Sequence, residues 1–331
     1  MSQETPPPPP QVLRTGIVHS DLFLQHETGH GHPESPLRYQ VIVDTLRTAE
    51  FADRLEWLAP RPAEREDLLR CHLGGYIDLV RREVLRGAQY LSTGDTSVGT
   101  HSWDAALYAA GGACLAVDSV VARMLKNAFC ALRPPGHHAT PGRGMGFCVF
   151  NNTAVAARYA QQRHGIGKVL IADWDVHHGN GTQDAFYADD SVFVFSTHQS
   201  PWYPGTGARD ETGHGRGLGT TMNRPFSAGA GRDEIFGAFA GDFLDAARKF
   251  KPELVLISAG FDSREGDPLG GFLLTDDDFA DLTLLLLDLA DEFAEGRVVS
   301  MLEGGYDLGG LASSVKAHCQ ALADHGRARA P

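Results

Sequence analysis

The chain has 331 residues, of which 42% are hydrophobic and 21% are charged, so it can bury a large core and does not have the composition of a disordered protein. Its formal net charge of −13 argues against non-specific binding to nucleic acid and suits a cationic partner, through electrostatic steering. No uninterrupted apolar run reaches the roughly 18–20 residues of a membrane span, and no basic-then-apolar signal stands at the N-terminus, so no membrane partner is expected.

Residues 1–12 are rich in proline and are expected to form a disordered tail outside the fold. From residue 13 to residue 331 we expect a single domain, because no linker or internal repeat interrupts the chain. Short β-branched runs predict strands at 15–19, 128–132, 168–172, 192–195, 254–258 and 298–302. Longer periodic runs predict helices at 36–49, 75–86, 103–124, 152–164, 232–249, 276–294 and 308–323. This alternation is typical of a parallel sheet between two layers of helices, a three-layer α/β/α fold.

The cysteines form no CxxC pair and stand in apolar or strand-like contexts. This pattern predicts reduced, mostly buried thiols in a cytoplasmic protein. The five positions are Cys71, Cys114, Cys130, Cys148 and Cys319.

Four predicted strands run directly into polar segments. The segments read RPPGHHA at 133–139, DWDVHHGNG at 173–181, AGFDS at 259–263 and EGGYD at 303–307. Ligands bind at the carboxyl ends of the strands in an open parallel sheet. We therefore expect these four segments to meet along one edge of the sheet.

Asp175 and His177 stand two residues apart just after a predicted strand, so their side chains point the same way if the segment is extended. Asp262 arrives from another strand end. Two carboxylates and one imidazole match a catalytic Zn²⁺ site most simply. Fe²⁺, which prefers two histidines and one carboxylate, is the second candidate. The alternative is that Asp175 and His177 only cap the following helix.

Two adjacent imidazoles, His137 and His138, follow a rigid Pro-Pro-Gly turn and indicate proton transfer beside the metal. Asp173 and Asn180 are candidates to orient them, and unequal partners would separate the two pKa values. Tyr306, in a glycine-rich segment, could polarise a carbonyl group and hold a developing oxyanion. The alternative for Tyr306 is simple packing on a loop.

Motifs for other chemistries are missing from the sequence: it contains no G-x-S-x-G elbow, Walker A motif, G-x-G-x-x-G, HExxH or EF-hand loop. The alternating glycines at 213–219 are interpreted as structural. A nucleic-acid-binding regulator is not favoured, because no basic stripe is present.

The residues singled out above resemble those of the histone deacetylase family, in particular its class II-like branch and the bacterial histone deacetylase-like amidohydrolases. The resemblance runs from His19 to Leu322. It is carried by HPESP at 32–36, GDT at 94–96, RPPGHHA at 133–139, GFC at 146–148 with Asn151-Asn152, DWDVHHGNGTQ at 173–183, SAGFDS at 258–263, GDPLG at 266–270 and LEGGY at 302–306. It implies an arginase–deacetylase fold with a central, mostly parallel eight-stranded sheet. It also implies hydrolysis of acetyl or other acyl groups from lysine side chains.

The resemblance also implies roles for single residues. It assigns Asp175, His177 and Asp262 as zinc ligands, His137 and His138 as the tandem catalytic histidines, and Tyr306 as the carbonyl-polarising tyrosine. Substrate contacts fall to Phe147 and Tyr203 as walls of the acyl-lysine tunnel, to the Gly146 carbonyl, to Asp95 at the rim, and to Leu269 at the mouth. A structural K⁺ would be held by the side chains of Asp173 and Ser196 with the carbonyls of Asp175, His177 and Thr197. A second K⁺ site would use carbonyls near Phe186 and Val192.

Two alternatives stay open. An acetylpolyamine amidohydrolase would share the fold and chemistry but take a small acetylated amine. Leu269 stands where one branch of polyamine-selective relatives carries an acid, and so favours acyl-lysine, although Glu27 and Glu34 could still supply negative charge at the rim. A non-enzymatic acyl-lysine-binding module is not favoured, because the metal ligands, the histidine pair and Tyr306 are all present.

Side chains of the early loop and one cysteine have no assigned chemistry. His26, His30 and His32 could form a second metal site, but we expect them to lie at the surface or the rim. Cys148 is expected to be an inert buried thiol. The sequence does not define the oligomeric state.

Overall fold

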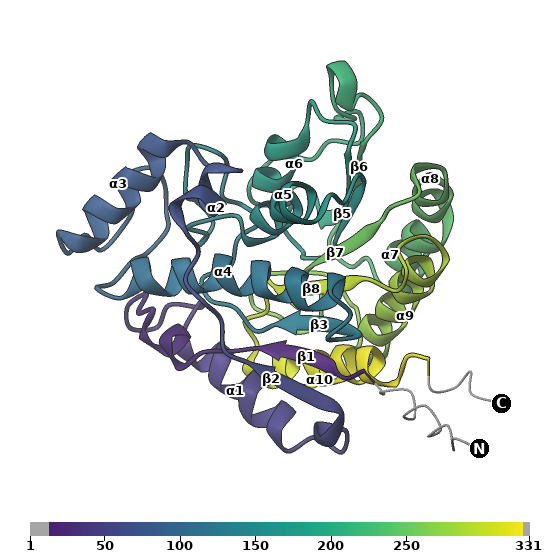
Figure 1. Ribbon diagram of the computed structural model, residues 1–331, viewed down its shortest axis with the longest axis horizontal. Helices are drawn as coiled ribbons and strands as arrows, with labels where there is room; N and C mark the ends of the chain where they lie inside the picture. Colours follow the sequence, from purple (N-terminus) through teal and green to yellow (C-terminus); the bar gives the residue numbers. More distant parts are fainter. Residues whose placement is uncertain (1–12, 327–331) are drawn as a thin grey trace, which may run out of the picture.

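The computed structural model describes residues 13–326, and the predicted N-terminal tail at 1–12 lies outside the described residues. The described chain forms one eight-stranded sheet with the strand order β2-β1-β3-β8-β7-β4-β5-β6 (Figure 1). Every neighbouring pair of these strands runs parallel. The strands are β1 (Thr15–Val18), β2 (Leu55–Leu58), β3 (Asn127–Cys130), β4 (Val169–Asp173), β5 (Val192–Gln199), β6 (Thr221–Phe226), β7 (Leu254–Ala259) and β8 (Val298–Leu302).

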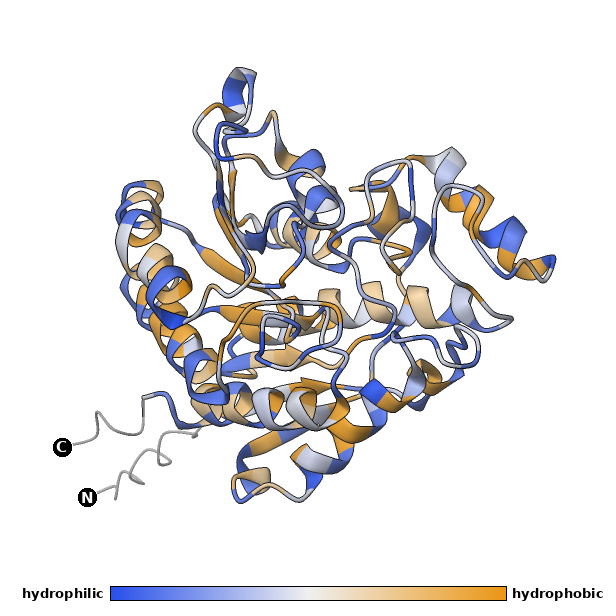
Figure 2. Cartoon of the chain, turned by 180° about the vertical axis from the view of Figure 1, so that it is seen from behind, coloured by the Kyte–Doolittle hydropathy of each residue, from blue (hydrophilic) through white to orange (hydrophobic). Residues whose placement is uncertain are grey.

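Helices cover the sheet in two groups, and each helix contacts at least one other helix of its group. The helices of one layer are α1 (Pro36–Arg47), α7 (Arg232–Ala238), α8 (Leu244–Phe250), α9 (Asp276–Phe293) and α10 (Leu308–Asp324). The helices of the other are α2 (Arg65–Leu69), α3 (Gly74–Leu85), α4 (Ser102–Val121), α5 (Asn152–His164) and α6 (Asn180–Phe186). The three-layer α/β/α architecture is therefore confirmed. The strands between the layers are largely apolar (Figure 2), as two-sided burial requires.

The six predicted strands are all present, but the sequence did not indicate the two edge strands. β2 reads LEWL and is buried only at its first residue, and β6 reads TMNRPF and contains Pro225. Proline is tolerated at the edge of a sheet because one side of an edge strand has no partner to bond. Half-exposed, polar edge strands lack the continuous apolar pattern that identified the buried ones.

The single helix predicted at 232–249 is wrong. The segment divides into α7, a π-helical turn at Phe239–Phe243, and α8. Within the turn, Gly241 takes φ −98° and ψ −115°, outside the helical region, which a residue without a Cβ adopts at little cost. The short helices α2 and α6 were not predicted either, because one or two turns show no measurable periodicity.

Reciprocal hydrogen bonds between Thr275 and Asp278 cap the start of α9. The Thr275 hydroxyl accepts a hydrogen bond from the Asp278 N–H, and the Asp278 carboxylate accepts from the Thr275 N–H at 2.8 Å. Three aspartates occupy the first helical turn, where the helix dipole is positive. The cap therefore sets the start of the helix at residue 276.

Among residues 13–326, α4 is the one helix long and apolar enough to cross a membrane by composition. Its residues 102–121 contact strands β1, β3 and β8 and helices α3 and α5, and 67% of its most apolar stretch is buried. The same composition is typical of a core helix in a folded domain. All five cysteines are free thiols, and four of them are buried.

Buried His318 predicts a loss of stability in mild acid. Its ring nitrogens lie 2.6 Å from Thr283 Oγ1 and 2.9 Å from Ser300 Oγ, and burial lowers its pKa from 6.5 to about 3. The unfolded chain takes up a proton below about pH 6.5 while the folded chain does not until about pH 3, so stability is lost as the pH falls through that range. At pH 5 this amounts to about 2 kcal/mol from this residue.

Chemical denaturation at pH 7 and pH 5 measures the effect. The variant His318→Gln should show a smaller loss between the two pH values than the wild type, whatever its absolute stability. His30→Gln, at an exposed loop position, serves as the control and should keep the wild-type loss. Equal pH dependence in all three proteins would remove His318 as the cause.

Candidate active site

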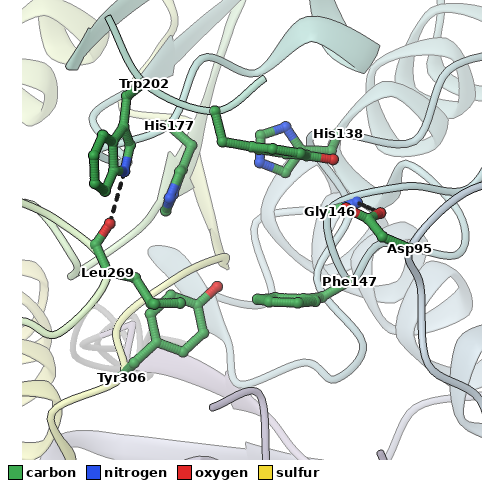
Figure 3. Close-up of a pocket in the computed structure, with 9 residues that line it drawn as sticks. Asp95, His138, Gly146, Phe147, His177, Trp202, Leu269 and Tyr306 are labelled. Atoms are coloured by element: carbon green, nitrogen blue, oxygen red, sulfur yellow. Dashed lines mark hydrogen bonds between the residues drawn. The ribbon is translucent and has the colours of Figure 1, made fainter. Parts of the chain in front are cut away.

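A cavity of about 220 Å³ opens at the carboxyl ends of the central strands (Figure 3). Its walls come from segments that follow β4, β5, β7 and β8, together with loops at residues 95 and 138–147. The polar strand ends therefore meet at one edge of the sheet, as the sequence predicted. The lining residues are Asp95, His138, Gly146, Phe147, His177, Trp202, Tyr203, Leu269 and Tyr306.

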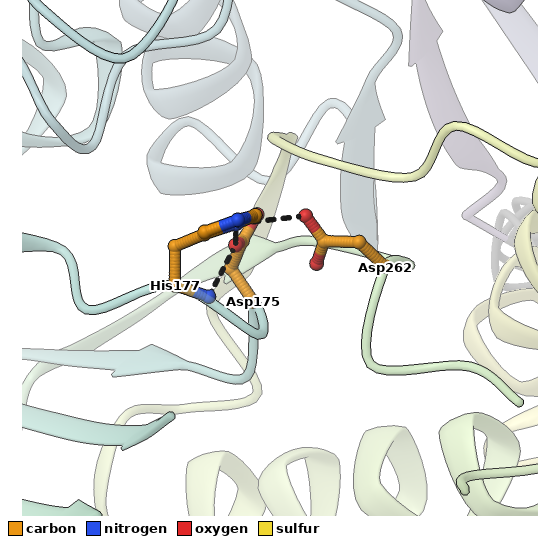
Figure 4. A group of neighbouring side chains, drawn as sticks. All are labelled: Asp175, His177 and Asp262. Carbon is orange, nitrogen blue, oxygen red and sulfur yellow. Dashed lines mark hydrogen bonds and ion pairs between the residues drawn. The ribbon is translucent and has the colours of Figure 1, made fainter. Parts of the chain in front are cut away.

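Asp175, His177 and Asp262 lie together (Figure 4), and His177 lines the cavity while the two carboxylates are fully buried next to it. His177 Nδ1 is 2.9 Å from Asp175 Oδ1 and 3.2 Å from Asp262 Oδ2, and one ligand atom of each residue lies within 4.8 Å of the others. Backbone N–H groups hold both carboxylates, because Gly304 donates to Asp175 Oδ2 at 2.8 Å and Val176 donates to Asp262 Oδ1 at 2.9 Å. The prediction that these three residues meet is confirmed.

The charges of this cluster call for a cation. Both carboxylates are completely buried, and Asp262 Oδ2 accepts no hydrogen bond besides its ion-pair contact with His177. Burial and the charge of Asp175 raise the pKa of Asp262 to about 7, whereas His137 and His177 outweigh burial and lower the pKa of Asp175. The two carboxylates raise the pKa of His177 to about 10 despite its burial, which reflects the negative charge gathered at this point. Two carboxylates and an imidazole around one point also fit a divalent ion.

The histidine pair differs in its partners. His137 Nδ1 donates to Asp173 Oδ2 at 2.9 Å, and His138 Nδ1 lies 2.8 Å from Asn180 Oδ1. Although burial opposes it, the charges of Asp175 and Asp173 raise the pKa of His137 well above 6.5. Burial and the neighbouring charge of His137 lower the pKa of His138 well below 6.5. The pKa values of the two rings are therefore shifted in opposite directions, the separation that the sequence predicted from unequal partners.

A buried glutamate, Glu303, fixes the turn that carries the pair. Its Oε2 atom accepts hydrogen bonds from Gly136 N at 2.7 Å and from His137 N at 3.1 Å. Burial raises its pKa to about 7. Although the sequence placed Glu303 in a motif, it gave no sign of this contact, which joins two strand ends that are 167 residues apart.

The phenol of Tyr306 points into the cavity (Figure 3). Burial raises its pKa well above 10, so the hydroxyl stays a hydrogen-bond donor. Behind it, the Arg38 guanidinium lies 4.8 Å from the ring centroid and donates to the carbonyls of Glu303 at 2.5 Å and Gly305 at 2.6 Å. Arg38 therefore holds the loop from which Tyr306 projects.

Glu34 corrects one expectation. It was expected at the rim, but it is completely buried, where it accepts from Arg38 at 3.2 Å and from Arg133 at 2.8 Å. Arg133 also donates to the carbonyls of Phe23 and His26. Two buried guanidinium groups require a carboxylate beside them, which explains why an acidic residue of this loop turns inward.

The histidines of the early loop occupy three different environments, and the expectation of a surface or rim role is wrong for His26. That residue is completely buried, with Nδ1 2.7 Å from Ser102 Oγ and Nε2 3.4 Å from Glu34 Oε2. His32 lies at the rim, edge-on to Phe147 at 4.7 Å between ring centroids. His30 is exposed. These three side chains do not form a second metal cluster.

Aromatic rings line the cavity. Phe147 lies edge-on to Tyr306 at 6.0 Å, and Tyr203 lies edge-on to His138 at 5.1 Å between ring centroids. Phe147 takes φ 66°, a left-handed conformation that costs energy for a residue with a side chain and is typical of functional sites. Next to it, Gly146 has φ 56°, and a Cβ there would lie 2.3 Å from the His138 ring. Asp95 Oδ1 accepts from Gly146 N at 2.7 Å and so fixes this turn.

The sequence did not single out Trp202, which lines the cavity beside Tyr203. The residue is 45% exposed, and its Nε1 donates to the carbonyl of Leu269 at 2.8 Å (Figure 3). This bond joins the loop after β5 to the loop after β7 at the mouth. The only signal available was a Trp-Tyr pair in the polar segment that follows the strand predicted at 192–195.

Comparisons with known proteins agree with this geometry. Residues 32–322 match the family model described as a histone deacetylase domain. The chain is 42% identical to histone deacetylase 10, chloroplastic, of Oryza sativa, with 93% of this chain and 73% of that protein covered. It is 39% identical to a histone deacetylase-like amidohydrolase of Pseudomonas aeruginosa, covering 86% and 75%.

Two further relatives support the same assignment. A probable deacetylase of Archaeoglobus fulgidus is 39% identical, with 89% of this chain and 82% of that protein covered. The crystal structure of the HDA15 HD domain superposes with a TM-score of 0.89 at 37% identity, covering 95% of this chain and 89% of that one. Sequence, sheet topology and the cluster of histidines and carboxylates therefore lead to one conclusion: the chain belongs to the histone deacetylase family and is a hydrolase of the deacetylase type, acting on amides.

Proposed function

We propose that the protein removes acetyl or other acyl groups from lysine side chains with a bound divalent cation, Zn²⁺ first and Fe²⁺ second. The observation that carries this proposal is the buried cluster of Asp175, His177 and Asp262 next to an aromatic-walled cavity. These three residues would hold the ion. A bound divalent ion supplies Lewis acidity, which polarises a carbonyl and brings the pKa of water towards about 7.

The histidines move protons in this proposal. Neutral His138 carries its proton on Nδ1, which faces the Asn180 carbonyl oxygen, so Nε2 is free to accept the proton of the attacking water. His137 is held as a cation between Asp173 and Asp175 and stabilises the negative charge that develops beside it. The lysine nitrogen leaves after receiving a proton from the pair. Tyr306 donates its hydroxyl hydrogen to the acyl oxygen as that oxygen becomes negative.

The shape of the cavity favours a long alkyl stem. Phe147 and Tyr203 supply aromatic walls, and Leu269 stands at the mouth without a charge. Acetylpolyamine hydrolysis is the second candidate. A small cationic amine would need an acidic side chain at this rim. Glu34 cannot provide it because the residue is buried, whereas Glu27 is exposed and keeps this alternative open.

The proposal also includes a structural K⁺ site and a location in the cytoplasm. Asp173 and Ser196 are buried and stand opposite each other in the β4–β5 register, which supports the structural K⁺ site implied with the carbonyls of Asp175, His177 and Thr197. The second K⁺ site, near Phe186 and Val192, stays a prediction. Five unpaired cysteines support a reducing compartment such as the cytoplasm.

A substrate panel tests the proposal. We expect hydrolysis of acetyl-lysine peptides to exceed that of acetylated polyamines, to stop with a chelator and to return when Zn²⁺ or Fe²⁺ is added back. The measurement is kcat/KM for each substrate and ion. Mg²⁺ serves as the control ion, because it prefers an all-oxygen octahedral site.

Each unfavourable outcome identifies the part that fails. Activity that survives complete metal removal would overturn the metal-dependent reaction. A higher kcat/KM for acetylated polyamines than for every acyl-lysine peptide would favour the second candidate. Binding of the peptides without turnover under any ion would favour a binding module.

A further inference from the structure

The carboxylate of Asp267 joins the catalytic tyrosine to the mouth of the cavity. Its Oδ2 atom accepts hydrogen bonds from Tyr306 N at 2.6 Å and from Asp307 N at 3.2 Å. Its Oδ1 atom accepts from Leu269 N at 2.9 Å. The residue is 7% exposed, so water competes little for these bonds. Three backbone donors from two loops therefore depend on one side chain.

The Asp267 contacts complement those of Arg38. Arg38 holds the carbonyls of Glu303 and Gly305, whereas Asp267 holds the next N–H, that of Tyr306. Gly305 lies between these contacts with φ 119°, a conformation open to glycine that carries little intrinsic stiffness. The direction in which the phenol projects is therefore set by bonds on both sides of a flexible residue.

The second oxygen of Asp267 extends this connection to the channel mouth. Leu269 donates its N–H to Asp267 and accepts from the Trp202 indole through its carbonyl at 2.8 Å. One chain of hydrogen bonds thus runs from Tyr306 through Asp267 and Leu269 to Trp202. Both ends of the chain line the same cavity.

Stabilising the start of helix α10 does not account for all the contacts of Asp267. Asp307 already caps this helix with its own side chain, which accepts from Gly310 N at 2.7 Å. The shortest bond of Asp267 goes to Tyr306, one residue before the cap, and its other oxygen serves a different loop. The contacts of Asp267 therefore fall on the reactive end and the mouth of the cavity.

We propose that Asp267 is a positioning residue that sets the phenol of Tyr306 and the Leu269–Trp202 side of the channel mouth with a single carboxylate. The proposal rests on the proposed role of Tyr306 in amide hydrolysis. A carboxylate offers acceptors on both oxygens, whereas an asparagine amide presents an NH₂ group to one of the loops. A displacement of about 1 Å at a reacting group can cost up to about 10²-fold in rate.

A double-mutant cycle tests the proposal with Asp267→Asn, Tyr306→Phe and the double variant. Asp267→Asn should lower kcat at least about 10-fold in the wild-type background and less than about twofold in the Tyr306→Phe background, because the lost positioning acts through the phenol. KM for an acetyl-lysine peptide should rise in both backgrounds, since the Leu269 contact is lost in both. Independent, multiplying effects on kcat would overturn the proposal.

Amide hydrogen exchange gives a readout separate from catalysis. The peptide 303–308 should exchange faster in Asp267→Asn than in the wild type, while 276–293 in α9 should not change. Asp278→Asn is the matched control, because Asp278 is also a buried acceptor of a backbone N–H but lies at the start of α9. It should lower the melting temperature without lowering kcat. Unchanged exchange at 303–308 would overturn the proposal.

The test also allows for a variant that does not fold and for a failure of the proposed role of Tyr306. If Asp267→Asn does not fold, Asp267→Glu takes its place in the cycle, because it keeps the charge and moves the carboxylate by one methylene group, with the same changes expected. If Tyr306→Phe alone keeps full activity, the proposed role of Tyr306 fails. The positioning by Asp267 is then judged on the exchange at 303–308 and on KM.

Discussion

Replacing Tyr306 with phenylalanine should lower kcat by about 10²–10³-fold, the usual cost of removing one oxyanion donor. The ring remains, so its contacts with Arg38 and Phe147 are kept and the fold should be unchanged. The side chains of Asp175, His177 and Asp262 contact one another directly, and removing the hydroxyl leaves these contacts in place. Metal content should therefore equal that of the wild type.

Steady-state kinetics on an acetyl-lysine peptide and elemental analysis of the Zn²⁺-loaded protein measure these two effects. Tyr159→Phe is the matched control, because its hydroxyl bonds Asp118 away from the cavity. It should leave kcat unchanged. Full activity of Tyr306→Phe would remove the tyrosine from the reaction, and a loss of metal would show a structural rather than a catalytic effect.

Replacing Asp262 with alanine should abolish tight metal binding and, with it, activity. The change removes one of three ligands and leaves Asp175 and His177 as the remaining pair. Losing a partner that only orients a ligand typically costs about 10–100-fold in metal affinity, so losing a ligand should cost more. Because a bound ligand stabilises the folded state, added Zn²⁺ should raise the melting temperature of the wild type but not that of the variant.

Elemental analysis after dialysis and melting curves with and without Zn²⁺ provide the measurement. Asp276→Asn is the control, since Asp276 binds Arg264 and Ser314 outside the cavity and is no part of the cluster. It should retain both metal and the Zn²⁺-induced stabilisation. Wild-type zinc content in Asp262→Ala would refute the ligand role of Asp262.

The sequence predicted which residues meet at the strand ends, because that arrangement follows from local rules. Asp175 and His177 lie at the end of a nearly all-apolar strand, and a buried parallel strand is among the clearest patterns in a sequence. The rule that ligands meet the carboxyl ends of such strands then brought in Asp262 and Tyr306. The resemblance to a family of amide hydrolases added the wall residues Phe147 and Tyr203, which no periodicity reveals.

What the sequence did not reveal depends on contacts between distant segments. Glu34 looks like a surface acid in a polar loop, and only the two arginines that fold against it, Arg38 and Arg133, turn it inward. Trp202 and Asp267 act through backbone groups of other loops, and a sequence carries no mark of which backbone atoms a side chain will reach. The edge strand β6 was missed because its buried positions carry the polar residues Thr221 and Asn223, so the strand shows no apolar pattern.

The buried hydrogen bonds of Arg133 limit how far the N-terminus of this protein can be truncated. Arg133 uses the carbonyls of Phe23 and His26, and strand β1 at 15–18 lies between β2 and β3 inside the sheet. These two carbonyls and strand β1 all precede residue 32, where the match to the family model begins. A fragment trimmed to that boundary would strip an inner strand from the sheet and leave a guanidinium without two of its acceptors. The smallest autonomous unit therefore starts upstream of the region by which the family is recognised.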